Sequence, residues 1–161
     1  MTLGFSRPLN KKLRFSSDLS MMNIGATVAS AGVEAFPASG NQYFLNTQVI
    51  GTGVLNGDDI TSLGLRFSDS STAKSVGIYS SSRLPLANNW RIYPRLTVSR
   101  LTWKTTSQSQ FKVSPIMRVD YSWNKVHFEA ELGGEWTSTK LPDDSEKTTG
   151  LFGSIGYRFE F

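Results

Sequence analysis

The sequence predicts an all-β protein whose strands follow one another in an antiparallel, up-and-down arrangement. Apolar and polar residues alternate with a period of two along most of the chain, and turn signals rich in Asn and Gly separate these stretches. No segment has helical periodicity longer than a turn or two. We expect nine strands, over residues 2–8, 12–24, 41–55, 60–69, 74–86, 90–104, 109–123, 126–139 and 147–161.

The connections between these strands are expected to alternate between two kinds. Tight turns are predicted at residues 10–11, 56–58, 87–89 and 124–125, where Asn and Gly tolerate positive φ. Longer polar loops are predicted at residues 25–40, 69–73, 105–108 and 141–147. Short turns at one end of a sheet and longer loops at the other are typical of outer-membrane β-barrels.

Composition excludes several classes of protein. The 161 residues are expected to form one domain, spanning 1–161. No apolar run approaches the roughly 18 residues that a membrane-spanning helix requires, so a helical membrane protein is excluded. The chain has no cysteine, and its 17 Lys and Arg residues form no basic run although the net charge is +4. This distribution argues against nucleic-acid binding.

Each predicted strand has one apolar and one polar face. In residues 126–136, Val126, Phe128 and Leu132 alternate with three carboxylates. In a soluble sandwich the apolar face is the core, so alternation alone does not separate a soluble from a membrane sheet. If the sheet closes into a membrane barrel, the charged residues line its lumen: Arg14, Asp18, Arg66, Arg91, Arg95, Lys112, Arg118, Asp120, His127, Glu129, Glu131, Glu135, Arg158 and Glu160.

Strand length and aromatic placement favour the membrane. Strands of about 12 to 15 residues exceed the usual soluble length and cover the 9 to 11 tilted residues that cross a bilayer. The four tryptophans lie near predicted strand ends, with Trp90 and Trp123 beside tight turns and Trp103 and Trp136 toward the loops. Two such groups form the aromatic girdles of a barrel. We therefore expect an up-and-down transmembrane β-barrel of eight or more strands.

The last predicted strand, GLFGSIGYRFEF at residues 150–161, alternates apolar residues to its final aromatic. It resembles the C-terminal signal by which bacterial outer-membrane β-barrels are recognised for insertion, and the matching residues are Tyr157, Phe159 and Phe161. The resemblance implies a Gram-negative outer membrane, contact with its lipid and lipopolysaccharide, and insertion by the barrel-assembly machinery. The sequence is also similar in texture to the C-terminal barrels that follow tetratricopeptide repeats in outer-membrane polymer-export proteins.

Nine strands leave two architectures open, because antiparallel single-chain barrels normally contain an even number. If residues 1–11 are a remnant, the other eight strands form a small barrel with a filled interior. Otherwise the chain is the C-terminal part of a larger barrel with a wet lumen. This second architecture implies an N-terminal barrel segment or a periplasmic partner, and the strand-like start at Met1 favours it.

Motifs for catalysis or ligand binding are weak. His127 is the sole histidine, so a cluster of histidine metal ligands is impossible, and no G-x-S-x-G motif accompanies it. Gly51-Thr52-Gly53 precedes no helix, as a phosphate loop would. Asp143, Asp144 and Glu146 lack the ligand spacing of a calcium loop. We expect no enzymatic activity, cofactor or metal.

Two functions use the charged face differently. In a wide barrel, hydrated charges bias the passage of charged solutes, which predicts a passive conduit or export pore for a polar solute or polymer. In a narrow barrel the charges must pair, which predicts a small, non-conducting structural or binding barrel. A soluble lipid-carrier barrel is disfavoured by strand length and by the terminal Phe161.

Overall fold

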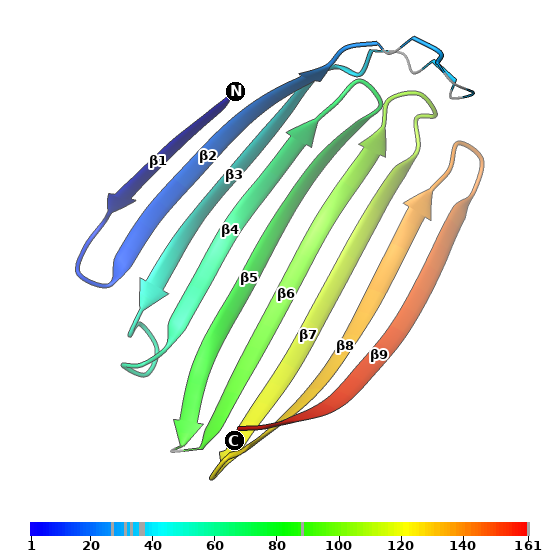
Figure 1. Ribbon diagram of the computed structural model, residues 1–161. Helices are drawn as coiled ribbons and strands as arrows, with labels where there is room; N and C mark the ends of the chain where they lie inside the picture. The colour runs from blue at the N-terminus through cyan, green and yellow to red at the C-terminus, as the bar shows by residue number, and fades with distance from the viewer. Residues whose placement is uncertain (27, 31, 33, 36–37, 88, 161) are drawn as a thin grey trace.

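The protein forms a single nine-stranded antiparallel sheet in which every strand pairs with its neighbours in sequence. A computed structural model describes residues 1–26, 28–30, 32, 34–35, 38–87 and 89–160 (Figure 1). No helix in these residues is long and apolar enough to cross a bilayer. The strands are β1 (Thr2–Pro8), β2 (Leu13–Ile24), β3 (Gly40–Thr52), β4 (Ile60–Asp69), β5 (Ala73–Ala87), β6 (Trp90–Trp103), β7 (Ser109–Trp123), β8 (Val126–Lys140) and β9 (Ser145–Phe159).

The all-β, up-and-down prediction is confirmed. Eight of the strands begin and end within two residues of the predicted bounds, and the exception is β3, which ends at Thr52 and not at residue 55. The end of the sheet that carries the β2–β3, β4–β5, β6–β7 and β8–β9 connections is called the loop end, and the opposite end is the turn end. The expected contrast in length is incomplete, because three residues join β4 to β5 at the loop end and seven join β3 to β4 at the turn end.

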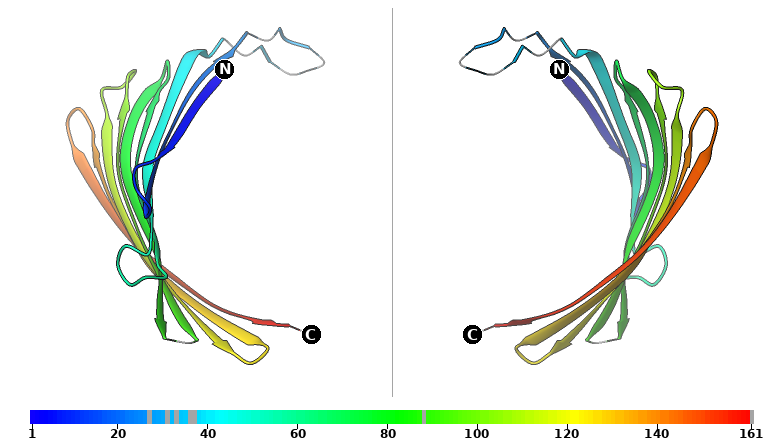
Figure 2. Two further views of the ribbon diagram at one scale, coloured as in Figure 1. Left: turned by 90° about the vertical axis from the view of Figure 1, so that its left-hand side faces the viewer. Right: turned by 90° about the vertical axis from the view of Figure 1, so that its right-hand side faces the viewer.

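The sheet is curved but open. Figure 2 shows it edge-on as an arc, with β1 and β9 at its two edges. No pairing joins β1 to β9 in the described part of the chain. Because neighbouring strands alternate in direction, β1 and β9 run the same way, from the loop end to the turn end.

Strand register assigns each side chain to one of two faces. Side chains directly opposite each other share a face, and the register is continuous except for one irregularity between Pro85 and Ala87. The polar face is defined by the row Arg91, Asp120, Glu129 and Gly156, and the apolar face by the row Trp90, Tyr121, Phe128 and Tyr157.

The polar face is the concave side of the arc. On this face, side chains reach past a neighbouring strand: Tyr79 of β5 donates a hydrogen bond to Gln48 of β3 at 3.0 Å, across β4. We therefore assign the apolar face to the convex side of the arc.

The described residues contain no hydrophobic core. Apart from glycines, Asp59 is the one buried residue among them. On the apolar face, Leu132 is 68% exposed, Leu151 77% and Ile155 89%. Burial of apolar area is the main stabilising contribution in folding, and a sheet normally gains it by packing a face against another layer. The convex face has no such layer among the described residues.

Asp59 organises the loop between β3 and β4. Its carboxylate accepts backbone hydrogen bonds from Leu55 at 2.8 Å and Asn56 at 3.0 Å, and a hydroxyl hydrogen bond from Thr61 at 3.2 Å. The hydrogen bonds from Asn56 and Leu55 lower the pKa of Asp59 below its usual value, against an opposing effect of burial. Asn56 also donates a hydrogen bond to the carbonyl of Pro85 in β5 at 2.7 Å, so the loop is tied to the neighbouring hairpin.

Replacing Asp59 with Asn is expected to loosen this loop at neutral pH, because the amide nitrogen cannot accept the hydrogen bond from Thr61 and is a weaker partner overall. Hydrogen exchange of the Leu55 and Asn56 amides should therefore be faster in Asp59→Asn. The matched control is Asp58→Asn, at an exposed neighbour, which should leave exchange unchanged.

The same loop is expected to depend on pH in the unmodified protein. Because the folded pKa of Asp59 is lowered, its stabilising contribution is fully present above the unfolded pKa of about 3.9 and is lost as pH falls through the folded value. Exchange at Leu55 and Asn56, corrected for intrinsic rates, should rise only in that acidic range. Equal exchange in Asp59→Asn and the unmodified protein at neutral pH would contradict this role.

Candidate functional site

The polar face gathers the charges predicted to line a lumen. Of the fourteen predicted residues, thirteen lie in strands with their side chains on this face, and Glu160 follows β9 and contacts two of them. The sheet thus brings together, on one concave surface, residues from six strands.

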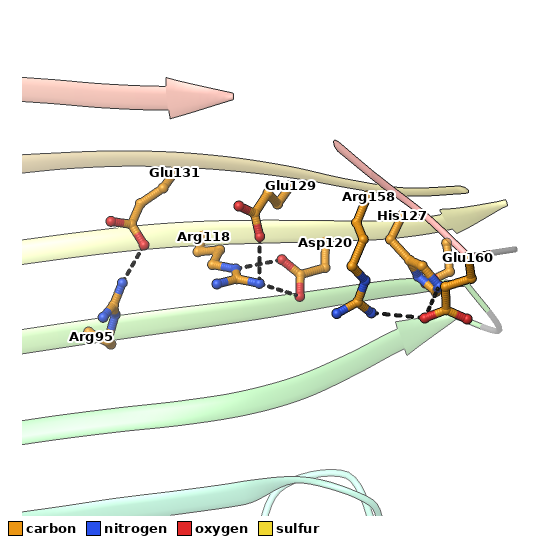
Figure 3. Close-up of polar contacts among 9 residues, drawn as sticks. Arg95, Arg118, Asp120, His127, Glu129, Glu131, Arg158 and Glu160 are labelled. Atoms are coloured by element: carbon orange, nitrogen blue, oxygen red, sulfur yellow. Dashed lines mark hydrogen bonds and ion pairs between the residues drawn. The ribbon is translucent and has the colours of Figure 1, made fainter. Parts of the chain in front are cut away.

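Over β6 to β9 these charges form a network of ion pairs (Figure 3). Arg118 lies at its centre, 2.7 Å from Asp120 and 2.9 Å from Glu129. Arg95 of β6 pairs with Glu131 of β8, across β7. Lys112 lies 2.6 Å from Glu135. Every carboxylate on the polar face of β7 and β8 therefore has a cationic partner.

His127 connects the β7–β8 hairpin to the end of β9. Its Nδ1 lies 2.8 Å from the Ser122 hydroxyl, and its Nε2 lies 3.2 Å from Glu160, which Arg158 also contacts at 3.1 Å. A hollow of about 270 Å³ adjoins Ser122 and His127. Serine, histidine and a carboxylate are the components of a hydrolase triad. The backbone N–H of Ser122 is, however, donated to Asn89 at 2.9 Å and is not free to stabilise an oxyanion. We interpret this chain of contacts as a structural link.

Over β2 to β6 the polar face carries cations without acidic partners. Arg14, Arg66, Arg83 and Arg91 are exposed, and none forms an ion pair within the described residues. On the polar face of the described residues, Asp18 of β2 and Glu146 of β9 are the carboxylates without a cationic partner. Counted with Glu160, this face carries eight Arg and Lys side chains and seven Asp and Glu side chains, a net excess of one positive charge. The cations lie mostly over β2 to β6 and the carboxylates mostly over β7 to β9.

Arg83 and Tyr79 were not predicted from the sequence. Alternation with Gly77 and Ser81 on β5 could have placed both on the polar face, but this strand has few charges to mark its faces. The Tyr79 ring lies over Gly64 of the adjacent strand and leaves no room there for a Cβ atom. Its hydroxyl contacts Asn46 and Gln48, and Arg66 lies 4.4 Å from the ring centroid. Tyr79 therefore positions one of the unpaired arginines by a cation–π contact.

The predicted aromatic residues divide between the two faces. Trp90, Trp123 and Trp136 are exposed on the apolar face, whereas Trp103 lies on the polar face. The ring centroids of Trp90 and Tyr121 lie 4.5 Å apart, and those of Tyr121 and Phe128 6.5 Å apart, so a row of aromatics follows the turn end. From the predicted terminal signal, Tyr157 and Phe159 lie on the apolar face, and Phe161 lies outside the described residues.

The described residues contain no group of three or more His, Cys, Asp and Glu side chains arranged to hold a metal ion. The polar face is thus a charged, hydroxyl-bearing surface whose acids are mostly paired and whose arginines are partly free.

Replacing Gly64 with Ala is expected to displace Tyr79 from its position over the strand. The added methyl group would overlap the Tyr79 ring, so the ring must give up its contacts with Asn46, Gln48 and Arg66. We expect a loss of about 1 to 3 kcal/mol in the free energy of unfolding, as for other overpacked sites. Denaturant titration of the folded protein measures this loss.

The control for this variant is Gly150→Ala in β9, where nothing lies within 4 Å of the added Cβ. Ala at position 150 should be neutral or slightly stabilising, because glycine in a strand interior costs conformational entropy. An equal free energy of unfolding for the two variants would show that the Tyr79 contacts do not contribute to stability.

No family model, curated protein or solved structure was found to match this chain.

Proposed function

We propose that this chain forms part of the wall of an outer-membrane β-barrel that acts as a conduit for polar, preferentially anionic, solutes or polymers. The observation that carries the proposal is the division of one continuous sheet into an apolar convex face and a charged concave face, without a hydrophobic core in the described residues. Lipid chains would cover the convex face, and water and solute would occupy the concave side.

The height of the apolar face fits a bilayer. From the aromatic row at Phe128 to the level of Ser138, where charged residues begin on neighbouring strands, there are ten residues along β8. At about 3.3 Å per residue this is roughly 33 Å, which a tilt of 35–45° reduces to about 25 Å. That is about the apolar band of an outer-membrane barrel.

The open sheet supports a wide barrel over a small one. An eight-stranded barrel would bring β2 and β9 together, but neither β1 nor β2 pairs with β9 among the described residues. The first strand pairs with β2 along its whole length, from Thr2 to Pro8, as an integral strand does. Since β1 and β9 run the same way, antiparallel closure requires an odd number of further strands. Within a bilayer closure is necessary, because unpaired backbone groups at an edge are costly in hydrocarbon.

The alternative is a non-conducting structural or binding barrel. The ion-pair network over β6 to β9 is the observation that favours it, because paired charges are what a filled interior requires. The unpaired arginines over β2 to β6 favour a hydrated lumen. In either case Tyr157 and Phe159 lie on the apolar face of β9, where the assembly machinery that the sequence resemblance implies would meet them.

Single cysteines at positions 131 and 132 test both the membrane and the lumen, and the absence of native cysteine gives a clean background. In Leu132→Cys, the free thiol should be shielded from water-soluble thiol reagents. A fluorophore attached to this cysteine should be quenched by a lipid-chain nitroxide. In Glu131→Cys, on the opposite face, the thiol should react with a water-soluble reagent if the lumen is wet.

Protection at both positions would indicate a filled barrel and overturn the conduit. Reaction of the cysteine at position 132 with the water-soluble reagent, without quenching by lipid, would overturn the membrane assignment altogether.

Ion selectivity tests the preference for anions. In planar bilayers under a salt gradient, the reversal potential of the full protein should indicate anion selectivity, and the variant Arg66→Gln/Arg83→Gln/Arg91→Gln should shift it toward cations. The control is Arg100→Gln, an exposed arginine on the apolar face, which should leave the reversal potential unchanged. Absence of conductance would contradict the conduit, whereas cation-selective conductance would contradict only the preference for anions.

A further inference from the structure

The loop between β3 and β4 contains the pair Asn56-Gly57, and Asn56 is the only asparagine in the chain that glycine follows. Both residues are exposed, and in Figure 2 this loop stands out from the arc of the sheet. Deamidation of asparagine begins when the backbone nitrogen of the next residue attacks the side-chain amide carbon. Glycine hinders this attack least, because it has no Cβ atom. The reaction is therefore least hindered at Asn56.

The backbone of Gly57 leaves its nitrogen accessible. Its φ is +87°, in the left-handed region that glycine adopts without strain, and nothing lies within 4 Å of a Cβ atom built on it. The Gly57 N–H donates no hydrogen bond to any residue that the structure describes, whereas the N–H of Asn56 is held by the Asp59 carboxylate at 3.0 Å. The nitrogen that would attack the amide is thus exposed and does not have to give up a backbone contact first.

The amide that would be attacked has a structural role in the closed loop. Asn56 Nδ2 donates a hydrogen bond to the carbonyl of Pro85 in β5 at 2.7 Å. This contact ties the loop to the neighbouring hairpin, and its donor is the nitrogen that leaves in deamidation. Because the contact restrains the side chain, we expect the reaction to proceed from molecules in which the loop has opened and Asn56 has left Pro85.

We propose that Asn56 is a site of spontaneous deamidation, and that the reaction permanently releases the β3–β4 loop from β5. The Gly57 nitrogen loses its proton to a base in solution and forms a bond to Cγ of Asn56, and the side-chain nitrogen leaves as ammonia. This intramolecular step gives a cyclic succinimide. Water then opens the ring at either carbonyl carbon and leaves aspartate or isoaspartate at position 56. The reaction consumes one water and releases one ammonia.

Either product removes the tie to Pro85. An ionised carboxylate only accepts hydrogen bonds, so it cannot donate to the Pro85 carbonyl as the Asn56 amide does. Isoaspartate also adds a methylene group to the main chain between residues 56 and 57. The product places one more negative charge in a loop that already carries Asp58 and Asp59. Because the lost amide is not restored, a released loop stays released, whether or not the sheet spans a membrane.

Asp59 controls the rate of this reaction by keeping the loop closed. Its carboxylate accepts the backbone hydrogen bonds of Leu55 and Asn56, which hold the segment that carries the Asn56 side chain to Pro85. The folded protein should therefore react more slowly than a free peptide of the same sequence. The variant Asp59→Asn, with its loosened loop, should react faster than the unmodified protein.

The test follows residue 56 by peptide mapping and mass spectrometry while the folded full chain is kept in warm, mildly alkaline buffer. Water enriched in heavy oxygen marks each opened succinimide, because the new carboxylate oxygen comes from the solvent. Asn124 is the control within the same molecule, since it is also exposed in a turn but is followed by Lys125. We expect the unmodified form to be lost several-fold faster at Asn56 than at Asn124, with labelled aspartate and isoaspartate as products.

Loss at Asn56 no faster than at Asn124 would overturn the inference, as would a product without isoaspartate or without the solvent label. This comparison is made within the unmodified protein, so it decides the question even if Asp59→Asn does not fold. A folded Asp59→Asn that reacts no faster than the unmodified protein would overturn the control of the rate by Asp59.

Release of the loop is tested with Asn56→Asp, which reproduces one product. Hydrogen exchange of the Leu55 amide, which donates to Asp59, should be faster in this variant than in the unmodified protein. The matched control is Asn124→Asp, which adds the same charge to another turn and should leave exchange at Leu55 unchanged. Equal exchange in the two variants would overturn the release of the loop.

Discussion

A single-layer sheet with one apolar face cannot be stable with that face in water, and the other features of this molecule depend on this constraint. Backbone hydrogen bonds between neighbouring strands align the sheet, but their net contribution to stability is modest because water competes for the same groups. The larger contribution has to come from removing the convex face from water. With Asp59 as the one buried non-glycine residue described, that contribution comes from outside the described chain.

The same constraint explains why register matters so strongly. A shift of one residue in any strand pair would move its charges to the convex face and its apolar residues to the concave face. The contacts that would oppose such a shift lie on the concave side. They are the ion pair of Arg95 with Glu131, the ion pair of Arg118 with Glu129, and the position of the Tyr79 ring over Gly64. Each joins different strands and depends on their alignment.

The sequence predicts the strands and the assignment of charges to one face well, because both follow from a period of two within a single strand. Arg95 and Glu131, in contrast, are 36 residues apart, and their pairing depends on the alignment of three strands, which alternation within one strand does not contain. Tyr79 and Arg83 were missed because β5 is rich in Ser and carries few charges. Residues 53–55 were predicted as the end of a strand but belong to the loop, where the Asp59 carboxylate accepts the backbone hydrogen bonds of Leu55 and Asn56. Trp103 was expected in an aromatic girdle. It is the last residue of β6, and alternation along that strand places it on the polar face.

Because each strand pairs only with its neighbours in sequence, the described sheet is a series of successive hairpins. Each hairpin contributes its own apolar and charged strip and depends on its neighbours only through their edges, so gain or loss of a hairpin changes the width of the sheet without rearranging the remainder. Nearest-neighbour pairing keeps most contacts local in sequence, which favours growth of the sheet by successive addition at an edge. The breadth of the concave surface then depends on how many hairpins are joined, and its chemistry depends on which residues each hairpin places on that side.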